Sequence, residues 1–313
     1  IDRKYNIILI ENSNDLDYAS VNALNLSGGT IKDLAGNDAT RTLPTPGASG
    51  SLSNNKNIII DTISPTVTNV TSSTSNGSYN ATSVISIQIT FSETVYVAGS
   101  SPYATLTLDT SSNDAGDAVV NYTSGSGSNT LTFNYTVADG ENSSDLDYVS
   151  VNALALSGGT IKDLAGNDAT RTLPTPGASG SLSSNKNIII DTTVNLISSF
   201  TMSNTSISLN ETSTVTLVFN EAVASFNSDD DIVVPNGTLS TMTTSNNITW
   251  TGVFTPTNDI YDTSNVLLLN NTYTDAAGNT GLTATTANFT IDTRTNWPTP
   301  VSYTHLTLPT TWS

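Results

Sequence analysis

Two reactive side chains are scarce in this chain of 313 residues. Cysteine is absent, and histidine occurs once, as His305. No disulfide can therefore cross-link the protein, and no thiolate can act as a nucleophile or a soft-metal ligand. If His305 is set aside, a Ser-His-Asp arrangement and a zinc site are excluded as well. Paired carboxylates for glycoside hydrolysis stay open, because acids are numerous. Their recurrence at repeated linker and turn positions nevertheless favours a protein that is not an enzyme.

Positive charge is also scarce. Lys and Arg number 9 against 27 Asp and Glu, which gives a net charge of −18 although only 12% of the residues are charged. Such a surface repels nucleic acid and anionic lipid, and it suits hard cations. No apolar run is long enough to span a membrane. We therefore expect neither nucleic-acid binding nor membrane insertion.

Both ends of the chain are unusual. The first residue is Ile1 rather than Met, and the first ten residues lack the composition of a signal peptide. We interpret the sequence as an interior fragment of a longer protein. Residues 301–310 (VSYTHLTLPT) resemble the in-frame translation of a transposase sequencing adapter. This resemblance implies that the tail, with His305, is an artefact; the alternative is a short natural linker.

The chain does contain a long internal repeat. Residues 11–62 recur as residues 141–192, offset by 130 positions, and 48 of the 52 positions are identical. The four differing pairs are Asn14/Ser144, Ala19/Val149, Asn25/Ala155 and Asn54/Ser184. A fixed internal period indicates tandem modules, which usually supply length or valency.

A short linker phrase marks the ends of these modules. The sequence IIIDT at residues 58–62 recurs at 188–192, and FTIDT at 289–293 is a third version. We predict four segments: a truncated C-terminal half-module at 1–62, a complete module at 63–192, a shorter module at 193–293, and a linker with the artefactual tail at 294–313. Because the first segment lacks its N-terminal half, we expect it to lack sheet partners.

Period-two alternation predicts short β-strands with one apolar face. The clearest runs of alternating apolar residues are Ile85/Ile87/Ile89/Phe91, Leu131/Phe133/Tyr135/Val137, Val215/Leu217/Phe219 and Ile248/Trp250/Phe254. Turn clusters such as Ser124–Gly127 and Pro235–Gly237 separate them, and no segment carries a helical apolar stripe. The pattern predicts an all-β fold of antiparallel sandwiches.

Two pairs of motifs carry a family resemblance. Residues 89–95 (ITFSETV) and 218–223 (VFNEAV) are each followed much later by an Asp-x-Ala-Gly-Asn motif, at 163–167 or 275–279. Together they resemble bacterial immunoglobulin-like repeats, over roughly residues 11–293. The resemblance implies tandem immunoglobulin-like antiparallel β-sandwiches, which fill the stalks of secreted and surface-anchored bacterial proteins.

The resemblance also implies a role. The leading hypothesis is a non-catalytic stalk or spacer fragment of a large extracellular bacterial surface protein, an adhesin in particular. Its partners would be neighbouring repeats of the same chain, and a host-cell, biofilm or polysaccharide target reached through regions outside this sequence. One alternative is a set of accessory modules of a secreted polysaccharide-acting enzyme. Another is direct carbohydrate binding through exposed aromatics such as Tyr96, Tyr103 and Tyr122.

Acidic residues recur where modules are expected to meet. In a sandwich of this type, the B–C and F–G loops lie at the pole where the chain enters. If Glu93 ends strand B and residues 163–167 form the F–G loop, both face the linker residue Asp61. The next junction repeats the set. The candidate metal ligands are Asp61, Glu93, Asp163, Asn167, Asp191, Glu221, Asp275 and Asn279.

Two interpretations of these residues remain. Carboxylates held about 4 Å apart repel by about 4 kcal/mol at an effective dielectric near 20, and a cation would remove that repulsion. Calcium suits a flexible, all-oxygen site better than magnesium, and it would stiffen the linkers. Alternatively, the Asp-x-Ala-Gly-Asn motif is only a turn, in which Asp accepts local backbone hydrogen bonds. A further acidic run, Asp229–Asp231, does not fit an EF-hand and is predicted to be a solvated loop.

Overall fold

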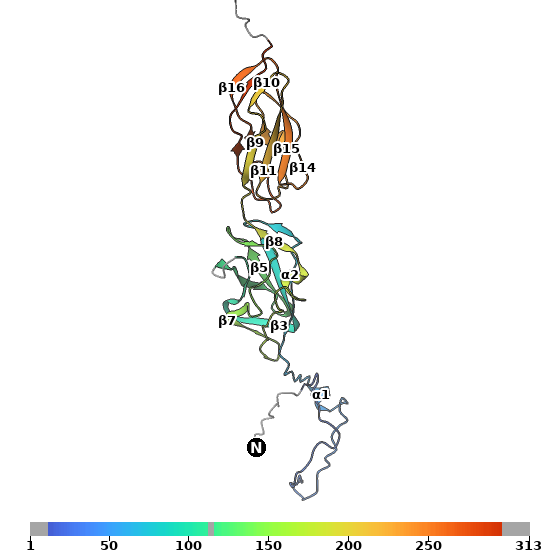
Figure 1. The fold of residues 1–313 in the computed structure, drawn as a ribbon. Helices are drawn as coiled ribbons and strands as arrows, with labels where there is room; N and C mark the ends of the chain where they lie inside the picture. Colours follow the sequence, from blue (N-terminus) through green and yellow to red (C-terminus); the bar gives the residue numbers. More distant parts are fainter. Residues whose placement is uncertain (1–11, 112–115, 296–313) are drawn as a thin grey trace, which may run out of the picture. The chain divides into compact units, whose positions relative to one another are not determined.

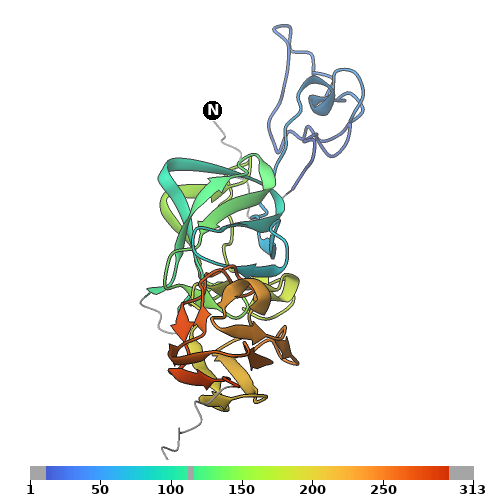
Figure 2. The same ribbon diagram turned by 90° about the horizontal axis from the view of Figure 1, so that it is seen from above.

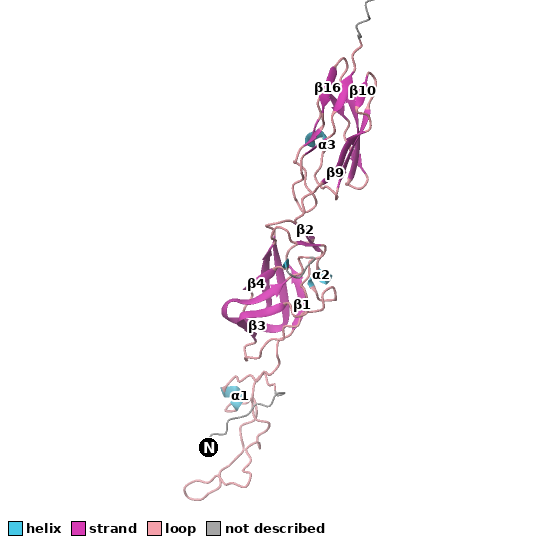
Figure 3. Ribbon diagram, turned by 60° about the vertical axis from the view of Figure 1, so that its left-hand side comes forward, coloured by secondary structure: helices cyan, strands magenta, loops and turns pink. Residues whose placement is uncertain are grey.

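The structure is a computed structural model that describes residues 12–111 and 116–295. Its regular structure is nearly all β, as predicted (Figure 3). The α-helices of the described residues are single turns of four residues: α1 (Leu52–Asn55), α2 (Leu182–Asn185) and α3 (Ser228–Asp231). No helix in this part of the chain is long and apolar enough to cross a membrane. The adapter-like tail and His305 lie outside the described residues.

The chain divides into two compact units. The first contains the described residues up to 76, residues 83–137 and residues 143–189; the second contains residues 77–82, residues 138–142 and the described residues from 190 onward. The predicted domain limits at residues 62, 192 and 293 remain predictions.

One long strand, β3 (Val84–Thr107), organises the sheet of the first unit (Figure 1). Its partners are β1 (Val67–Ser72), β4 (Val119–Ser124), β5 (Ser128–Thr136) and β7 (Leu154–Lys162), all antiparallel. The predicted alternation is confirmed here, because Ile87 and Ile89 are fully buried and pair with the buried Phe133 and Leu131. A separate three-stranded sheet has the order β2 (Gly77–Tyr79), β8 (Ile188–Asp191), β6 (Asn142–Ser143).

Glu93 does not end a strand, and this prediction was wrong. It lies inside β3, where the register with β5 shifts between Thr90 and Val95. The reason is that β3 continues past this irregularity and pairs with β7 from Tyr96 onward. The counterpart Glu221 does lie beyond a strand end, two residues after β11 (Ser213–Phe219).

The second unit is a sandwich of three sheets. The largest has the order β13-β15-β11-β9, with β14 also paired to β15, and the two smaller sheets have the orders β10-β19-β16 and β12-β17-β18. The strands are β9 (Ile197–Met202), β10 (Ser206–Ser208), β12 (Ile232–Val233), β13 (Gly237–Leu239), β14 (Thr243–Thr244), β15 (Thr249–Pro256), β16 (Tyr261–Asn265), β17 (Leu268–Leu269), β18 (Ala284–Thr285) and β19 (Phe289–Asp292). All pairs are antiparallel except β10 with β19.

Aromatic rings fill the core of this sandwich. Phe219 lies 5.1 Å from Tyr273, and Phe254 lies 5.3 Å from Phe289, measured between ring centroids; all four side chains are buried. Val215 and Leu217 are buried as the alternation predicted. Trp250 and Ile248 are only half-buried, because β15 begins at Thr249 and its buried face starts deeper in the strand.

The two copies of the repeat have different structures. Residues 154–162 form β7, which buries Leu154 (1% exposed) and Ile161 (2% exposed) against β3. The same segment of the first copy belongs to no strand in the described residues, and Leu24 and Ile31 are 41% and 45% exposed (Figure 2). The strand therefore depends on its partner β3 rather than on its own sequence.

The loops of the repeat, in contrast, form in both copies. Ser53 and Ser183 each donate to the equivalent carboxylate, Asp17 or Asp147, at 2.6 Å. The hydroxyls of Tyr18 and Tyr148 donate to the backbone carbonyls of Pro44 and Pro174. Ser51 and Ser181 cap the short helices α1 and α2. These contacts join residues within the repeat, so they need no other part of the chain.

The acidic run Asp229–Asp231 is only partly solvated, so that prediction was wrong for one of its residues. The run forms the helical turn α3, and Asp231 is 4% exposed. Its carboxylate accepts hydrogen bonds from the backbone NH of Asn227 and the hydroxyl of Thr272. Because one helical turn directs its third acid inward, consecutive acids have different environments.

Candidate cation site at two acidic clusters

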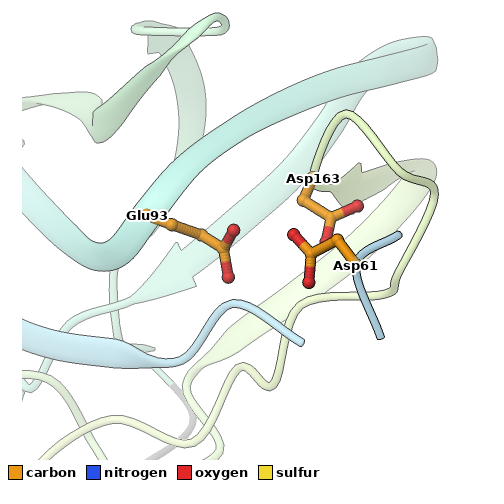
Figure 4. A group of neighbouring side chains, drawn as sticks. All are labelled: Asp61, Glu93 and Asp163. Atoms are coloured by element: carbon orange, nitrogen blue, oxygen red, sulfur yellow. The ribbon is translucent and has the colours of Figure 1, made fainter. Parts of the chain in front are cut away.

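Six of the eight predicted ligands form two groups of three carboxylates. We call them the first acidic cluster (Asp61, Glu93, Asp163) and the second acidic cluster (Asp191, Glu221, Asp275). In each cluster, one carboxylate oxygen of each residue lies within 4.8 Å of the other two. Figure 4 shows the three carboxylates of the first cluster converging from separate segments. The same arrangement thus occurs in two modules of different sequence.

The linker acids are held by short turns. Asp61 accepts a hydrogen bond from the backbone NH of Ile63, and Asp191 accepts one from that of Thr193, both at 2.9 Å. Such turns of Asp onto the backbone two residues later are locally encoded. They fix the first acid of each cluster.

The buried acids open the Asp-x-Ala-Gly-Asn turns. Asp163 accepts from the backbone NH groups of Gly166 and Asn167, and Asp275 accepts from those of residues 277–279, at 2.7–3.0 Å. Gly166 and Gly278 have φ values of 100° and 93°, which glycine adopts without strain. The turn interpretation therefore describes these motifs correctly.

The two predicted asparagines connect the turn to the linker. The side-chain amide of Asn167 donates to the carbonyl oxygen of Asp61 (3.0 Å) and to Asp163 (2.7 Å). Asn279 donates in the same way to Asp191 and Asp275, both at 2.9 Å. The amide nitrogens therefore hold the linker and the turn together by hydrogen bonds, and the carboxylates supply the charged oxygen atoms that could ligate a cation.

A turn alone does not account for the glutamates. In the first copy, Asp33 and Asn37 form the same turn, with hydrogen bonds of 2.8 Å from both the backbone and the side chain of Asn37. Within the described chain, that turn belongs to no acidic cluster. The turn is therefore a local structure, whereas the clusters arise only when tertiary folding brings a glutamate and a linker aspartate beside it.

The glutamates carry the electrostatic strain of the clusters. Burial raises the pKa of Glu93, and the charges of Asp61 and Asp163 raise it further. Burial likewise raises the pKa of Glu221, with added repulsion from Asp191 and Asp275, while a hydrogen bond to Asn220 acts in the opposite direction. The ion pairs found in the described residues are Lys32–Asp38, Lys162–Asp168 and Arg294–Asp292. No protein cation among them neutralises either cluster.

Sequence inspection missed one buried polar residue in the unit of the second cluster. Asn195 is fully buried, and in the described structure neither its amide oxygen nor its amide nitrogen has a hydrogen-bond partner. Its only sequence signal is its position, four residues after the linker acid Asp191, where the first cluster has Pro65 four residues after Asp61.

The tyrosines considered for carbohydrate stacking differ in exposure. Tyr103 and Tyr122 are half-buried and pack edge to face, with ring centroids 6.0 Å apart. Tyr96 is 40% exposed. These rings do not form a continuous exposed platform.

Comparisons with known proteins give one family match and several distant structures, including the three that follow. No curated protein matches the sequence. The chain is similar to the Escherichia coli adhesin FdeC, at 9% identity and a TM-score of 0.32, over 70% of this chain and 63% of that one. It is similar to the I9–I11 tandem of titin, at 9% identity and a TM-score of 0.25, over 73% of this chain and 65% of that one. It is also similar to domains 4–9 of the surface layer protein SbsC, at 12% identity and a TM-score of 0.19, over 90% of this chain and 46% of that one. The chain thus spans less than two thirds of each of these chains, and likenesses this weak say nothing about function.

The family match falls on the second unit. Residues 191–291 match a family described as "Bacterial Ig-like domain". This range contains the strands β9 to β18 and the whole second acidic cluster. The resemblance predicted from residues 218–223 and 275–279 is thereby confirmed for this segment: residues 191–291 match the bacterial Ig-like domain family.

Proposed function

We propose that this chain is a non-catalytic structural segment of a bacterial surface or secreted protein, and that a cation in each acidic cluster clamps the linker to the module it enters. The observation that carries the proposal is the recurrence of one arrangement, a linker Asp, a Glu and a turn Asp, in two modules of different sequence. Structural repeats share features that every module needs, whereas a catalytic site is usually present once.

Calcium is the cation that fits the donors best. Each cluster offers carboxylate oxygens from three separate segments, and the chain has no cysteine and no histidine among its described residues. Calcium accepts six to eight oxygen ligands in flexible geometry, with water completing the set, whereas magnesium requires a near-ideal octahedron. The binding of a cation would offset the repulsion that raises the pKa of Glu93 and Glu221.

In this role the modules act as a spacer. Stiffened linkers would hold a distal binding region away from the cell, as expected of a stalk in an adhesin. Neighbouring repeats are then the immediate partners, and the host-cell, biofilm or polysaccharide target is bound elsewhere. The net charge of −18 supports an extracellular setting, where calcium is abundant and a highly acidic surface favours solubility.

The test is a thermal melt of the full chain in calcium and in chelator. Calcium at 100 times its Kd would stabilise a module by about 2.7 kcal/mol, which corresponds to a rise in Tm of at least about 5 °C. The double variant Glu93→Gln/Glu221→Gln should lose most of this shift, because each cluster then lacks one charged ligand.

The control is Asp168→Asn. Asp168 is an exposed carboxylate next to the turn of the first cluster, but it pairs with Lys162 and belongs to neither cluster. This variant should keep the full calcium shift. An unchanged Tm of the wild-type chain in calcium would refute the cation proposal and leave only the turn interpretation.

A further inference from the structure

The unit that contains the second acidic cluster also contains buried polar atoms without hydrogen-bond partners. In the described residues, four buried side-chain atoms have no hydrogen-bond partner: Oδ1 and Nδ2 of Asn195, Oε1 of Glu221 and Nε1 of Trp250. Buried polar groups without partners cost free energy, so each one in a native structure requires an explanation. Three of these four atoms belong to two residues.

Asn195 and Glu221 lie just beyond the adjacent ends of β9 and β11. Phe219 of β11 pairs with Ile197 of β9. Beyond the strand ends, the backbone NH of Asn220 donates to the carbonyl oxygen of Leu196 at 2.9 Å, and the side-chain Oδ1 of Asn220, in place of its backbone carbonyl, accepts from the backbone NH of Leu196 at 2.6 Å. Residues 220 and 196 are thus held side by side, and residues 221 and 195 are the next along the two segments.

The pairing also determines the face on which these two side chains lie. Opposed residues in an antiparallel pair direct their side chains to the same face, and residues two apart share a face. Asn195 and Glu221 thus lie on the face of the buried Phe219, the core face. At the same end of the sandwich, Asp275 is buried and Asp191 precedes Asn195 by four residues. An extension of this register beyond the strand ends would bring the buried Asn195 amide next to Glu221 of the second cluster.

The first cluster has a different residue at this position. Ser92 donates from its backbone NH to the carbonyl of Thr66, and Thr66 donates to the hydroxyl of Ser92, so Pro65 is the residue opposite Glu93. Pro65 is buried and has no polar side chain. Among the described residues, no buried side-chain atom of the first cluster lacks a hydrogen-bond partner. Each cluster thus has the same three kinds of carboxylate residue, and the two clusters differ in the residue at this one position.

We propose that Oδ1 of Asn195 is a fourth protein ligand to a calcium ion in the second acidic cluster, and that this cluster binds calcium more tightly than the first. The inference rests on the proposed function. Amide oxygens are ordinary calcium ligands. The amide nitrogen of the same side chain can donate to a neighbouring carboxylate, which would satisfy the second unpartnered atom. On a chain with both clusters, calcium then fills the second cluster before the first.

The experiment is a calorimetric calcium titration of the full chain and three single variants. The wild type should show two classes of site. Asn195→Ala should weaken the tighter site by at least about 10-fold, the order expected for a lost metal contact, and leave the weaker site unchanged. Glu93→Gln should abolish the weaker site alone. Asn195→Asp keeps the size of the side chain and a ligand oxygen, so it should bind calcium at least as tightly as the wild type.

The melting temperature of Asn195→Ala separates ligation from packing. In chelator, its Tm should equal or exceed that of the wild type, because the substitution removes an unsatisfied buried amide. In calcium, its Tm should fall below that of the wild type. An amide that only packs or binds a buried water would lower the Tm equally in both solutions.

The outcomes also separate this inference from the proposed function. Two calcium sites of equal affinity, or binding constants that Asn195→Ala does not change, would overturn the role of Asn195 while the clusters remain calcium sites. Absence of calcium binding to the wild-type chain would overturn both. In the matched first cluster, Pro65→Asn should tighten binding if an amide at this position is a ligand.

Discussion

At the residue scale, Glu221 links folding to pH. Burial and the neighbouring Asp191 and Asp275 raise its pKa in the folded chain above its ordinary value of 4.5. The folded protein therefore keeps this proton at pH values where the unfolded chain has released it. The stabilising effect of the proton is fully present below the unfolded pKa and is lost as pH rises through the folded pKa.

This linkage predicts the behaviour of Glu221→Gln. In chelator, acidification from about pH 7 to about pH 5 should raise the Tm of the wild type, and it should raise the Tm of Glu221→Gln by less, because only Glu93 of the two buried glutamates still titrates there. In calcium, acidification should not raise the Tm of the wild type, because the cation stabilises the charged carboxylate. Glu211→Gln, outside both clusters, should behave like the wild type. A pH profile of Tm that is identical for Glu221→Gln and the wild type would contradict the assignment.

At the element scale, β7 exists because β3 is beside it. The segment at residues 24–32 differs from that at 154–162 only at Asn25, yet it forms no strand in the described structure. The close approach of β7 to β3 depends on Gly159. A Cβ on this residue would lie 2.6 Å from the backbone Cα and carbonyl oxygen of Tyr103. On the equivalent Gly29, the nearest atom would be the carbonyl oxygen of Leu26, at 3.2 Å.

The two glycines therefore form a matched test. Gly159→Ala should destabilise the first unit by about 1–3 kcal/mol, as overpacking against rigid backbone does. Gly29→Ala should change stability by less than about 0.5 kcal/mol. Hydrogen exchange of peptides covering β3 and β7 should accelerate in the first variant alone. Equal effects of the two substitutions would show that β7 does not depend on this contact.

The same elements show what the sequence can and cannot predict. The alternation at residues 85–91 and 131–137 predicted buried strands, because each residue's face follows from the pleat. The identical sequence of the two repeat copies cannot predict that β7 forms in only one of them, since a strand requires a partner. The carboxylates of the clusters were found from recurrence of the same acids at both junctions. Asn195 was not found, because its burial in the folded chain is not indicated by any recurrence in the sequence.

At the scale of the whole molecule, the proposed spacer role depends on how stiff the linkers are. Asp191 lies at the end of β8 and is also a member of the second cluster. A cation there would tie Asp191, at the end of β8, to Glu221 and Asp275, which belong to the same second unit. Because the chain has no cysteine, spin labels can be attached at introduced cysteines alone.

Distance measurements between two labels test this directly. With labels at Thr136→Cys on β5 and Thr255→Cys on β15, both exposed positions, calcium should narrow the distribution of distances. Glu221→Gln should keep the distribution broad. Glu93→Gln should leave the narrowing intact, because Asp61 of the first cluster does not lie in the chain between the labels. A distribution that calcium leaves unchanged would refute the stiffening of this linker.

The four differences between the two copies have a consequence for how such a chain changes its length. In the complete module, Ser144, Val149, Ala155 and Ser184 are all exposed, so every buried residue of the second copy is also present in the first. A hybrid of the two copies, joined at any of the 52 positions, would thus inherit an intact core. Unequal crossing-over within the repeat would add or delete one period of 130 residues without a packing defect. The length of the protein can then change by whole periods of 130 residues while the fold of each module is preserved.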